Sequence, residues 1–410
     1  MRRHLQGETG RREASDVAGD GASERTSSRR LEWEPYRMSE THEPAHDLAR
    51  RFTQPPHAVQ TGCRLGEPRC SARSPRTHAR RESDRTFSSA RRGEAAVLGG
   101  EVDAKRSSWT PLPYQDWKET QSTLHLWTQI VGKIRLVQTP WTNHSWHVPL
   151  YVTSRGLTTS PIPYGMRTFE IVFDFLDHAL RIQTSEGAVE TLELAPRTVA
   201  DFYHELLGRL RALGIEVRIR TMPCEIPDAI PFDVDQSHGT YQAEHATRFW
   251  RVLVQADRVL KEFRSRFIGK SSPVHFFWGS FDLAVTRFSG RRAPPHPGGV
   301  PNLPDWVARE AYSHEVSSCG FWPGGESMPH PVFYAYAYPE PEGFRTSPVR
   351  PAAAHYSAEL GEFLLAYDDV RRATSPDAML LEFLQSSYEA AADRGGWDRP
   401  ALERQAERQQ

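Results

Sequence analysis

An abrupt change in composition and apolar periodicity near Trp109 constrains the fold of this chain more than any other feature. Many arginines but no lysine precede Lys105, and this stretch is rich in Ser, Ala, Gly, Pro and Glu. Its sparse apolar residues follow neither a helical nor a strand period. Such a segment cannot bury enough apolar surface to offset the entropy of ordering it. We therefore expect residues 1–105 to be a disordered extension or upstream sequence translated from an over-extended start site.

Residues 106–397 are expected to form a single domain. Aromatic residues become frequent there and clear periodicities begin. A segment of this size buries about three quarters of its unfolded surface, so its core needs neither metal nor disulfide. The remaining residues, 398–410, are expected to form a disordered tail.

Apolar residues at three- and four-residue steps predict several amphipathic helices. The clearest spans residues 198–213, with Thr198 as N-cap and Gly214 as the residue that ends it. A second N-cap is expected at Ser375, followed by Pro376 in the first turn. The other expected helices span residues 115–135, 241–267 and 376–393.

The strand patterns come in consecutive groups separated by helices, which favours an α+β fold with a mainly antiparallel sheet. Residues 169–194 alternate apolar and polar positions and predict a meander. Residues 274–288 are apolar on both parities and predict one central strand covered on both faces. The other expected strands span residues 215–220, 315–322, 332–338 and 362–367. Residues 291–305, rich in Pro and Gly, predict a long surface loop or lid.

The charge balance argues against several classes of partner. A formal net charge of −1 over 410 residues gives no electrostatic case for nucleic acid or an anionic membrane. No apolar run is long enough to span a bilayer, and the basic start lacks the apolar region of a signal peptide. We expect a soluble, cytoplasmic protein without nucleic-acid or membrane partners. Four cysteines without a C-x-x-C pair also argue against disulfides and cysteine-based zinc sites.

Sequence motifs for common cofactors are missing. Gly269-Lys270-Ser271 resembles the end of a phosphate-binding loop, but Arg264 stands where that motif needs glycine. Neither G-x-G-x-x-G nor G-x-S-x-G occurs. The pair His314-Glu315 lacks the second histidine of H-E-x-x-H. The sequence therefore leaves the cofactor unknown.

Ionisable residues embedded in apolar, aromatic segments are the unusual feature of the domain. Buried ionisable groups are costly unless paired, so they either complete a structural network or build a site. The candidates for catalysis are His144, His147, Arg155, His275, Asp282, His314 and Glu315.

Three chemical arrangements of these residues stay open. Histidines and one carboxylate could bind zinc or iron, and the residues for this are His144, His147, His314 and Glu315. His275 with Asp282 could do acid–base work, although their opposite parity along one strand requires a bulge at Gly279. Arg155 and Arg287 could clamp a carboxylate or phosphate beside a tryptophan such as Trp278 or Trp322.

The alternative to all three is structural. Each histidine would then be hydrogen-bonded in the core, and each Asp–Arg pair would only stabilise the fold. The tyrosines at 334, 336 and 338 alternate along one strand, which is more typical of a packed sheet face than of a binding surface.

Several long segments resemble a family of bacterial proteins known only as a domain of unknown function. They are WKETQSTLHLWTQIVGKIRL, PWTNHSWHVPLYVTSRGLTTSPIP, PVHFFWGSFDLAVTRFSGR, SHEVSSCGFWPGG and FYAYAYPEPEGF. The similarity covers residues 109–397. It implies a single-domain protein that begins shortly before Trp117, so the long N-terminal stretch departs from the family. It implies no activity, cofactor or catalytic residue.

The function predicted from the sequence is therefore open between classes. We favour an enzyme of unassigned reaction whose cleft is lined by the seven candidates, because several segments place ionisable groups inside apolar strands. The alternatives are a non-catalytic module that grips a small organic ligand with Trp and Tyr, or a purely structural protein. In the first two cases the expected partner is a small molecule. The oligomeric state stays unknown.

Overall fold

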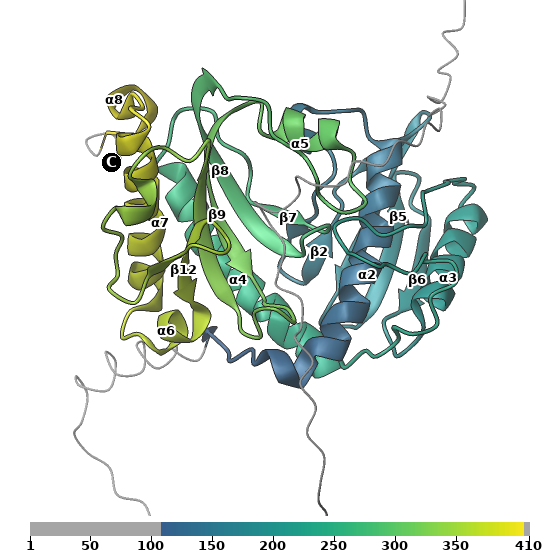
Figure 1. Cartoon of the computed structure of the whole chain (residues 1–410). Helices are drawn as coiled ribbons and strands as arrows, with labels where there is room; N and C mark the ends of the chain where they lie inside the picture. The colour runs from purple at the N-terminus through teal and green to yellow at the C-terminus, as the bar shows by residue number, and fades with distance from the viewer. Residues whose placement is uncertain (1–107, 406–410) are drawn as a thin grey trace, which may run out of the picture. The chain divides into compact units, whose positions relative to one another are not determined.

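The structure, a computed structural model, describes residues 108–405 (Figure 1). The expectations for residues 1–105 and for the end of the C-terminal tail lie outside the described residues. Within them, helices combine with two antiparallel sheets, which confirms the predicted α+β class. None of the helices described is both long and apolar enough to cross a membrane.

The first sheet has the strand order β1-β2-β4-β5-β6, with β3 paired to β4. Its strands are β1 (Tyr151–Val152), β2 (Gly156–Thr158), β3 (Ile162–Tyr164), β4 (Arg167–Asp174), β5 (Ala179–Thr184) and β6 (Val189–Glu193). The predicted meander corresponds to β4, β5 and β6. Phe169, Ile171 and Phe173 of β4 are buried, as their alternation with more polar residues requires.

Two helices pack beside this sheet, α2 (Tyr114–Gln138) and α3 (Val199–Ala212). Thr198 caps α3, since its side chain accepts a hydrogen bond from the Asp201 amide, and Gly214 follows with φ +66°. The Trp127 ring of α2 stacks on Phe202 of α3, with 4.6 Å between ring centroids. In Figure 1, α2 lies between the two sheets.

The second sheet has the strand order β11-β12-β10-β9-β8-β7. Its strands are β7 (His275–Phe277), β8 (Asp282–Arg292), β9 (His314–Trp322), β10 (Val332–Tyr338), β11 (His355–Ser357) and β12 (Glu362–Ala366). The expected strands near 315–322, 332–338 and 362–367 are confirmed. The expectation of a strand over residues 215–220 is wrong, because these residues pair with no other strand of the described chain.

The prediction of one central strand over residues 274–288 is also wrong. The chain turns at residues 278–281, where Phe281 has φ 59°, and makes the hairpin of β7 and β8. Trp278 fixes the turn. Its indole donates to the Val148 carbonyl at 2.9 Å, and its ring lies so close to Gly132 that a Cβ on this glycine would clash with it. A tertiary contact with α2 therefore interrupts an apolar run that locally resembles one strand.

Helices α4 (Ala243–Ser265) and α7 (Pro376–Arg394) cover one face of the second sheet. Figure 1 shows α4 behind the strands and α7 at the left. Leu283, Phe321 and Phe333 point to this side and join one continuous apolar core that also includes the first sheet. The remaining short helices are η1 (Asn143–Ser145), α5 (Asp305–Ala311), η2 (Phe344–Thr346), α6 (Tyr367–Arg372) and α8 (Arg399–Leu402).

The C-terminal residues from 398 to 405 differ from the disordered tail expected there. Asp398 accepts a hydrogen bond from the Ala401 amide and starts α8. Arg399 forms ion pairs with Glu389 and Asp393 of α7 and with Glu403. These ion pairs hold residues 398–405, where the sequence predicts a disordered tail.

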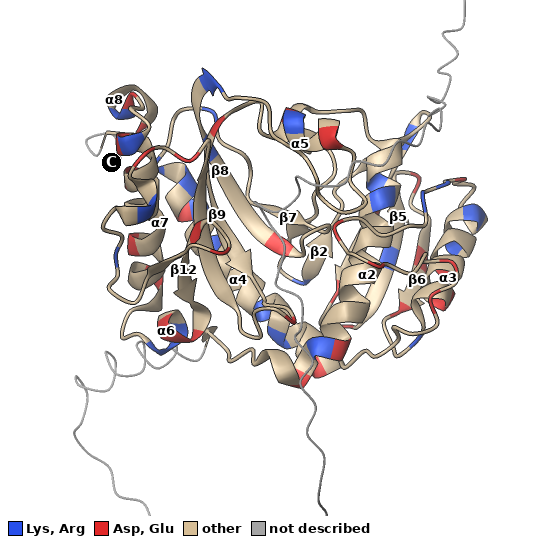
Figure 2. Ribbon diagram, in the orientation of Figure 1, with Lys and Arg blue, Asp and Glu red and all other residues tan. Residues whose placement is uncertain are grey.

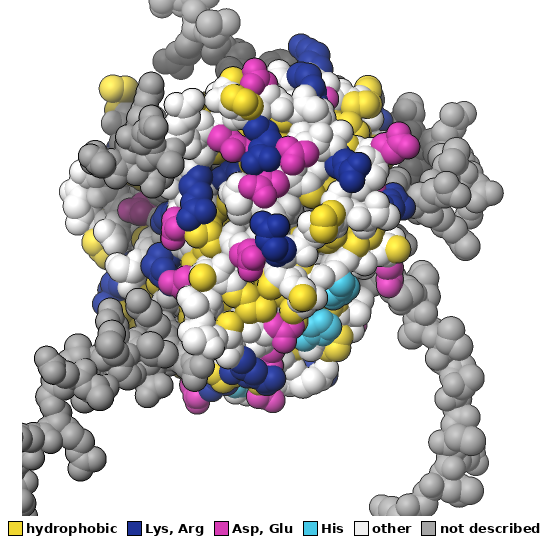
Figure 3. All heavy atoms as spheres, turned by 90° about the vertical axis from the view of Figure 1, so that its left-hand side faces the viewer, with side chains coloured by type: hydrophobic (Ala, Val, Ile, Leu, Met, Phe, Trp, Pro, Cys, Tyr) yellow, Lys and Arg dark blue, Asp and Glu magenta, His cyan; other side chains and the backbone are white. Residues whose placement is uncertain are grey.

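The charges are distributed unevenly over these elements. They lie mainly on helices and loops, and few occur on the strands of the second sheet (Figure 2). On the face that carries α7 and α8, basic and acidic side chains are interspersed rather than separated by sign (Figure 3). Asp282, at the start of β8, is the one acidic residue of this strand, which also carries Arg287, Arg291 and Arg292.

Candidate functional site

The face of the second sheet that α4 and α7 leave uncovered carries most of its polar side chains. Strand residues alternate between the faces, so the register defines which side chains lie together. Ala284, Gly320 and Tyr334 form one cross-strand row, and Thr286, Ser318 and Tyr336 form the next. We call this surface the polar face, and it comprises Asp282, Thr286, Ser318, Tyr334, Tyr336 and Glu362.

Asp282 is the buried carboxyl at one end of the polar face, where β8 begins. The Tyr334 hydroxyl donates to its Oδ2, and the Ser280 hydroxyl donates to its Oδ1. Tyr334 stands on β10 and Asp282 on β8, so the tyrosine ring has to cross β9. It crosses at Gly320, where a Cβ would lie 2.6 Å from the Tyr334 hydroxyl and would also meet the Leu283 carbonyl. The absence of a side chain at residue 320 is what allows the two strands to be linked.

Two more carboxyls accompany Asp282. Glu362 comes from β12, and Glu225 comes from the loop between α3 and α4. The Glu225 carboxyl lies against Gly279, where a Cβ would collide with it. Its loop is fixed by the buried Gln129 of α2, which accepts from the Cys224 amide and donates to the Cys224 carbonyl, each at 2.9 Å.

These three carboxyls are not neutralised by basic residues of the described chain, because none of them forms an ion pair with Lys, Arg or His there. Burial raises the pKa of Glu225 to about 7 and that of Glu362 to about 8, with the negative charge of Asp282 as the second cause. Burial also raises the pKa of Asp282, against the hydrogen bonds from Ser280 and Tyr334, which lower it. Carboxyls in this state can both give and take protons near neutral pH.

Tyrosines surround the carboxyls. The hydroxyls of Tyr312 and Tyr336 lie 2.7 Å apart, and the Tyr334 and Tyr336 rings stack at 6.2 Å. Burial, as the largest cause, keeps the pKa of Tyr334 and of Tyr336 well above the ordinary value. Both phenols therefore stay neutral hydrogen-bond donors. Beside them the half-buried His296 ring stacks on Tyr312, with 4.7 Å between centroids.

His144 lies near the far end of the polar face, where it contacts Phe288 of β8. Its Nδ1 donates to the carbonyls of Glu310 and Ala311, both at 3.1 Å. Its Nε2 consequently accepts from Lys270 Nζ at 2.5 Å. Burial, and then the Lys270 charge, lower the pKa of His144. Both ring nitrogens of His144 are thus occupied in holding α5 and Lys270.

His275 is buried near Tyr151, and His147 is buried near Trp141. The Tyr151 hydroxyl lies 3.4 Å from His275 Nε2, and the Thr142 amide donates to His147 Nδ1 at 3.2 Å. His275 lies on the same face as Asp282, because the chain turns between them and residues 275 and 277 pair with 284 and 282. The bulge expected at Gly279 is therefore not what brings them to one side. No hydrogen bond joins the two side chains.

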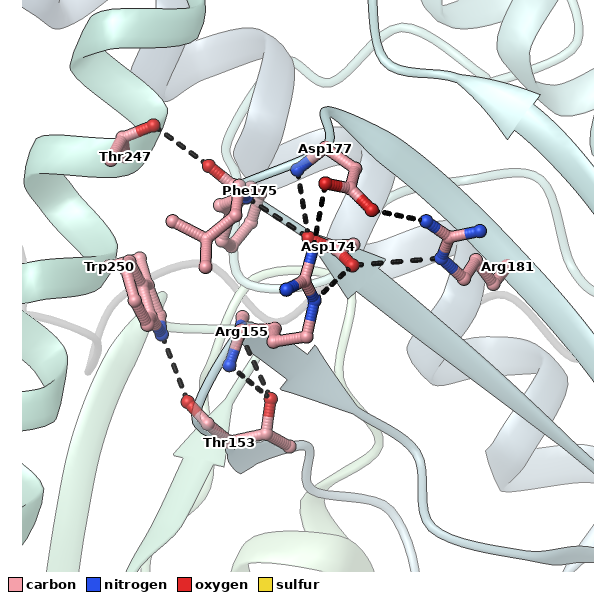
Figure 4. Close-up of polar contacts among 10 residues, drawn as sticks. Thr153, Arg155, Asp174, Phe175, Asp177, Arg181, Thr247 and Trp250 are labelled. Atoms are coloured by element: carbon pink, nitrogen blue, oxygen red, sulfur yellow. Dashed lines mark hydrogen bonds and ion pairs between the residues drawn. The ribbon is translucent and has the colours of Figure 1, made fainter.

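Arg155 and Glu315 lie away from the polar face. Arg155 belongs to the first sheet, where its Nε bonds Asp174 at 2.6 Å and its Nη2 bonds Asp177 at 2.8 Å (Figure 4). Glu315 accepts from Arg291 Nε at 2.9 Å and Nη2 at 2.7 Å. Both residues stabilise turns and edges of the fold.

The expected clamp of Arg155 with Arg287 is not formed. Arg287 lies on the core face of the second sheet, between the rings of Phe263 and Tyr388, and donates to the Phe263 carbonyl. The two arginines belong to different sheets, and each is held by partners of its own: Arg155 by Asp174 and Asp177, and Arg287 by the Phe263 carbonyl.

The four expected metal ligands do not form one site. The rings of His144 and His314 are neighbours at 5.9 Å, but His147 packs on Trp141 and Glu315 is bound to Arg291. Between residues 108 and 405, no group of three or more His, Cys, Asp or Glu side chains is arranged to hold a metal ion.

Sequence reasoning missed Tyr334, Tyr336 and Glu362 of the polar face, and Glu225 and Tyr312 beside it. The alternating tyrosines of β10 did signal one shared face, but they were interpreted as packing. Gly320 lies between a cysteine and a phenylalanine in an apolar strand, and a glycine at such a position indicates that another group passes close to the backbone. Glu225 sits in an irregular segment and carries no periodic signal at all.

The chain matches the model described as "Family of unknown function (DUF5996)" over residues 109–404. This match bears out the resemblance seen in the sequence, and it extends seven residues beyond the expected C-terminal boundary (404 − 397). No curated protein and no solved structure matches the chain.

Proposed function

Since the chain belongs to DUF5996, a family whose function is unknown, we propose a function from its own site: general acid–base catalysis on a small polar molecule bound at the polar face. The observation that carries this function is the trio of carboxyls Asp282, Glu225 and Glu362, held among tyrosines without a basic partner in the described chain.

The carboxyls differ in their readiness to hold a proton. General acid–base catalysis is most efficient when the pKa of the group lies near the working pH. Glu225, with a pKa of about 7, and Glu362, with a pKa of about 8, meet this condition. Repulsion between like charges disfavours ionising all three together. One group can then donate a proton to a substrate while another accepts one.

A second candidate is a non-catalytic module that binds a small aromatic or polar ligand. The observation in its favour is the stack of His296 on Tyr312, with Tyr338 5.1 Å from His296. Such rings present flat apolar surfaces with polar ends, which suits ligand binding without chemistry.

One experiment distinguishes the two candidate functions: the purified protein is incubated with a fractionated metabolite extract, and the mixture is analysed by mass spectrometry. An enzyme consumes a compound and forms a product over time, whereas a binding module only co-purifies with its ligand. We expect turnover by the wild type and a loss of at least about a hundredfold in Asp282→Asn, the range associated with acid–base groups.

Asp257→Asn is the matched control for this experiment. Asp257 is similarly buried, but it lies on α4 and pairs with Lys261 at 2.5 Å. Turnover should survive in this variant. Equal turnover in Asp282→Asn and the wild type would remove the catalytic assignment, and enrichment of a ligand without any product would favour the binding module.

We also propose that the protein acts in the bacterial cytoplasm. The resemblance of its segments to bacterial proteins supports this. Cys224 and Cys319 are free, and burial raises the pKa of both thiols to about 12. Cell fractionation with a specific antibody would test it, and recovery from the periplasm or the medium would contradict it.

A further inference from the structure

Lys270 is a lysine whose hydrogen-bond partner is a histidine rather than a carboxylate. Its Nζ donates to His144 Nε2 at 2.5 Å. The lysines that form ion pairs within residues 108–405 are Lys118 and Lys261, and Lys270 is not among them. Lys270 is also exposed to solvent. An amine that is accessible and has no counter-charge can react with small molecules, so its surroundings decide what it does.

The hydrogen bonds of His144 fix which of its ring nitrogens is a base. Nδ1 lies 3.1 Å from the carbonyls of Glu310 and of Ala311, and a carbonyl only accepts, so Nδ1 carries the hydrogen. Burial, as the largest cause, and then the charge of Lys270 lower the pKa of His144, so the ring is neutral. The lone pair of Nε2 is therefore directed at the amine of Lys270.

The aromatic rings beside Lys270 limit the access of water to its amine. Nζ lies 4.9 Å from the centre of the Phe288 ring and 5.4 Å from that of Trp146. Ring faces attract an ammonium weakly, but the removal of water disfavours the charged form. The second effect is the larger one here, because burial lowers the pKa of Lys270. A lysine becomes a nucleophile when such a surrounding favours its neutral amine.

The other charged groups at this end of the sheet do not hold the ammonium form. His314 of β9 pairs in register with Arg292 of β8. Burial, and then the charges of Lys270 and Arg292, lower the pKa of His314, so its ring is neutral as well. The carboxylate of Glu310 accepts from Trp141 Nε1 at 3.0 Å. The neighbours of Lys270 are thus neutral, positive or engaged elsewhere.

The backbone of Lys270 is fixed to the edge of β8. Its carbonyl accepts from the Phe288 amide at 3.0 Å, and Ser271 bridges to Arg287. Since Arg287 lies on the core face, Lys270 points to the opposite side, where Phe288 lies. His144 is held separately, through its bonds to the end of α5. The amine and its base therefore come from two anchored segments.

We propose that Lys270 is a nucleophilic amine that condenses with the carbonyl group of a small aldehyde or ketone, and that His144 transfers the proton. The lone pair of Nζ forms a bond to the carbonyl carbon, and the π electrons of the carbonyl move to its oxygen. His144 Nε2 takes a proton from the attacking nitrogen and delivers it to that oxygen, which gives a carbinolamine. The hydroxyl then leaves as water with the second N–H proton, and an imine remains. The step needs neither an oxidant nor a reductant.

This site is separate from the carboxyls of the polar face. Lys270 lies beside Phe288, six positions along β8 from Asp282 (288 − 282). Six strand residues span about 20 Å, which is too far for Asp282 to take part in the same reaction. The proposal therefore does not rest on the proposed acid–base function.

Reductive trapping of the imine in the full chain tests the proposal. The protein is incubated with propanal and sodium cyanoborohydride, which reduces an imine to a stable amine, and peptides are mapped by mass spectrometry over time. The lysines compared are Lys118, Lys261 and Lys270. Lys261 is the matched internal control, because its Nζ also makes a bond of 2.5 Å, but to the carboxylate of Asp257.

We expect Lys270 to be labelled at least about tenfold faster than Lys118 and Lys261, since a positioned base contributes about a hundredfold or more. Labelling of Lys270 at the rate of the other two would overturn the proposal. This comparison is made in the wild type, so it does not depend on the folding of any variant.

His144→Gln separates proton transfer from mere positioning. A glutamine can still accept from Lys270 and donate to a carbonyl, but it is not a base. The labelling rate of Lys270 should fall to that of Lys118, and an unchanged rate would remove His144 from the reaction. His204→Gln, at an exposed histidine of α3, is the control and should keep the wild-type rate.

Asp282→Asn distinguishes this site from the proposed acid–base function. The variant should lose turnover and keep the labelling rate of Lys270. Fast labelling in a wild type that shows no turnover would remove the acid–base function and leave the imine-forming lysine in place. A loss of labelling in Asp282→Asn would contradict the assignment of a separate site.

Discussion

Gly320 holds a position that no other residue can occupy without moving its neighbours. It lies on the central strand β9, and the Tyr334 hydroxyl passes over it to reach Asp282. Burial, as the largest cause, keeps the pKa of Tyr334 well above its ordinary value, so the phenol remains a donor. The link between β8 and β10 therefore depends on one missing side chain.

Gly320→Ala tests this dependence. The new methyl group would meet the Leu283 carbonyl and the Tyr334 ring, so we expect a loss of about 1–3 kcal/mol in the free energy of unfolding. Urea unfolding measures it. Gly208→Ala in α3 is the control, since a Cβ there meets only Arg211 Nη2, at 3.8 Å. That variant should be about 0.5–1 kcal/mol more stable, and similar results for both would contradict the steric account.

Glu362 makes the stability of the protein depend on pH. Burial raises its pKa to about 8, above the ordinary value of 4.5, so the folded chain binds its proton more tightly than the unfolded chain. The stabilisation by this proton is complete below about pH 4.5 and is lost as the pH rises towards 8. Between these values, the free energy of unfolding should fall because of this group.

Glu362→Gln removes that dependence. Relative to the wild type, the variant should gain stability at pH 8 compared with pH 5, measured by urea unfolding at both values. Glu359→Gln, a change at an exposed residue near the start of β12, is the control and should shift stability equally at both. An unchanged difference between Glu362→Gln and wild type across this range would show that the carboxyl is not held protonated.

The N-termini of α3 and α7 are similar in sequence, but their capping residues make different hydrogen bonds. Thr198 and Ser375 were both expected as N-caps, and both occupy that position. Only Thr198 accepts a hydrogen bond from an amide of its helix, that of Asp201 at 3.0 Å, whereas the Ser375 side chain makes no such bond.

Thr198→Ala should therefore destabilise the protein by about 1 kcal/mol, the usual value for a lost N-cap. Ser375→Ala should cost clearly less, because it removes no capping bond. Thermal unfolding of the two variants side by side decides the matter. Equal losses would mean that the difference between the two caps has no energetic consequence.

At the scale of the whole molecule, residues 108–405 contain one continuous apolar core that joins both sheets and their helices. This supports the expectation of a single domain that needs no residue before about 106. A shortened chain beginning at Val102 should keep the full cooperative unfolding transition, with an unchanged midpoint in urea. A clear loss of stability would show that the N-terminal stretch contributes to the fold.

The sequence by itself determined the elements of this protein. Local apolar periodicity predicted α2, α3, α4 and α7 to within a few residues, and alternation predicted the meander and most strands of the second sheet. Local signals suffice here because the three- to four-residue and two-residue periods follow from helix and strand geometry alone. The α+β class followed from the order of those elements.

The tertiary structure decided which residues meet. The turn at residues 278–281 split one predicted strand into a hairpin and brought His275 and Asp282 to one face, and Trp278 fixed that turn against Gly132. Glu225 reached Asp282 only because Gln129, 95 positions from Cys224, holds its loop. Such pairings depend on burial and contacts between distant segments, which no local period encodes, so the sequence named Asp282 but not its partners.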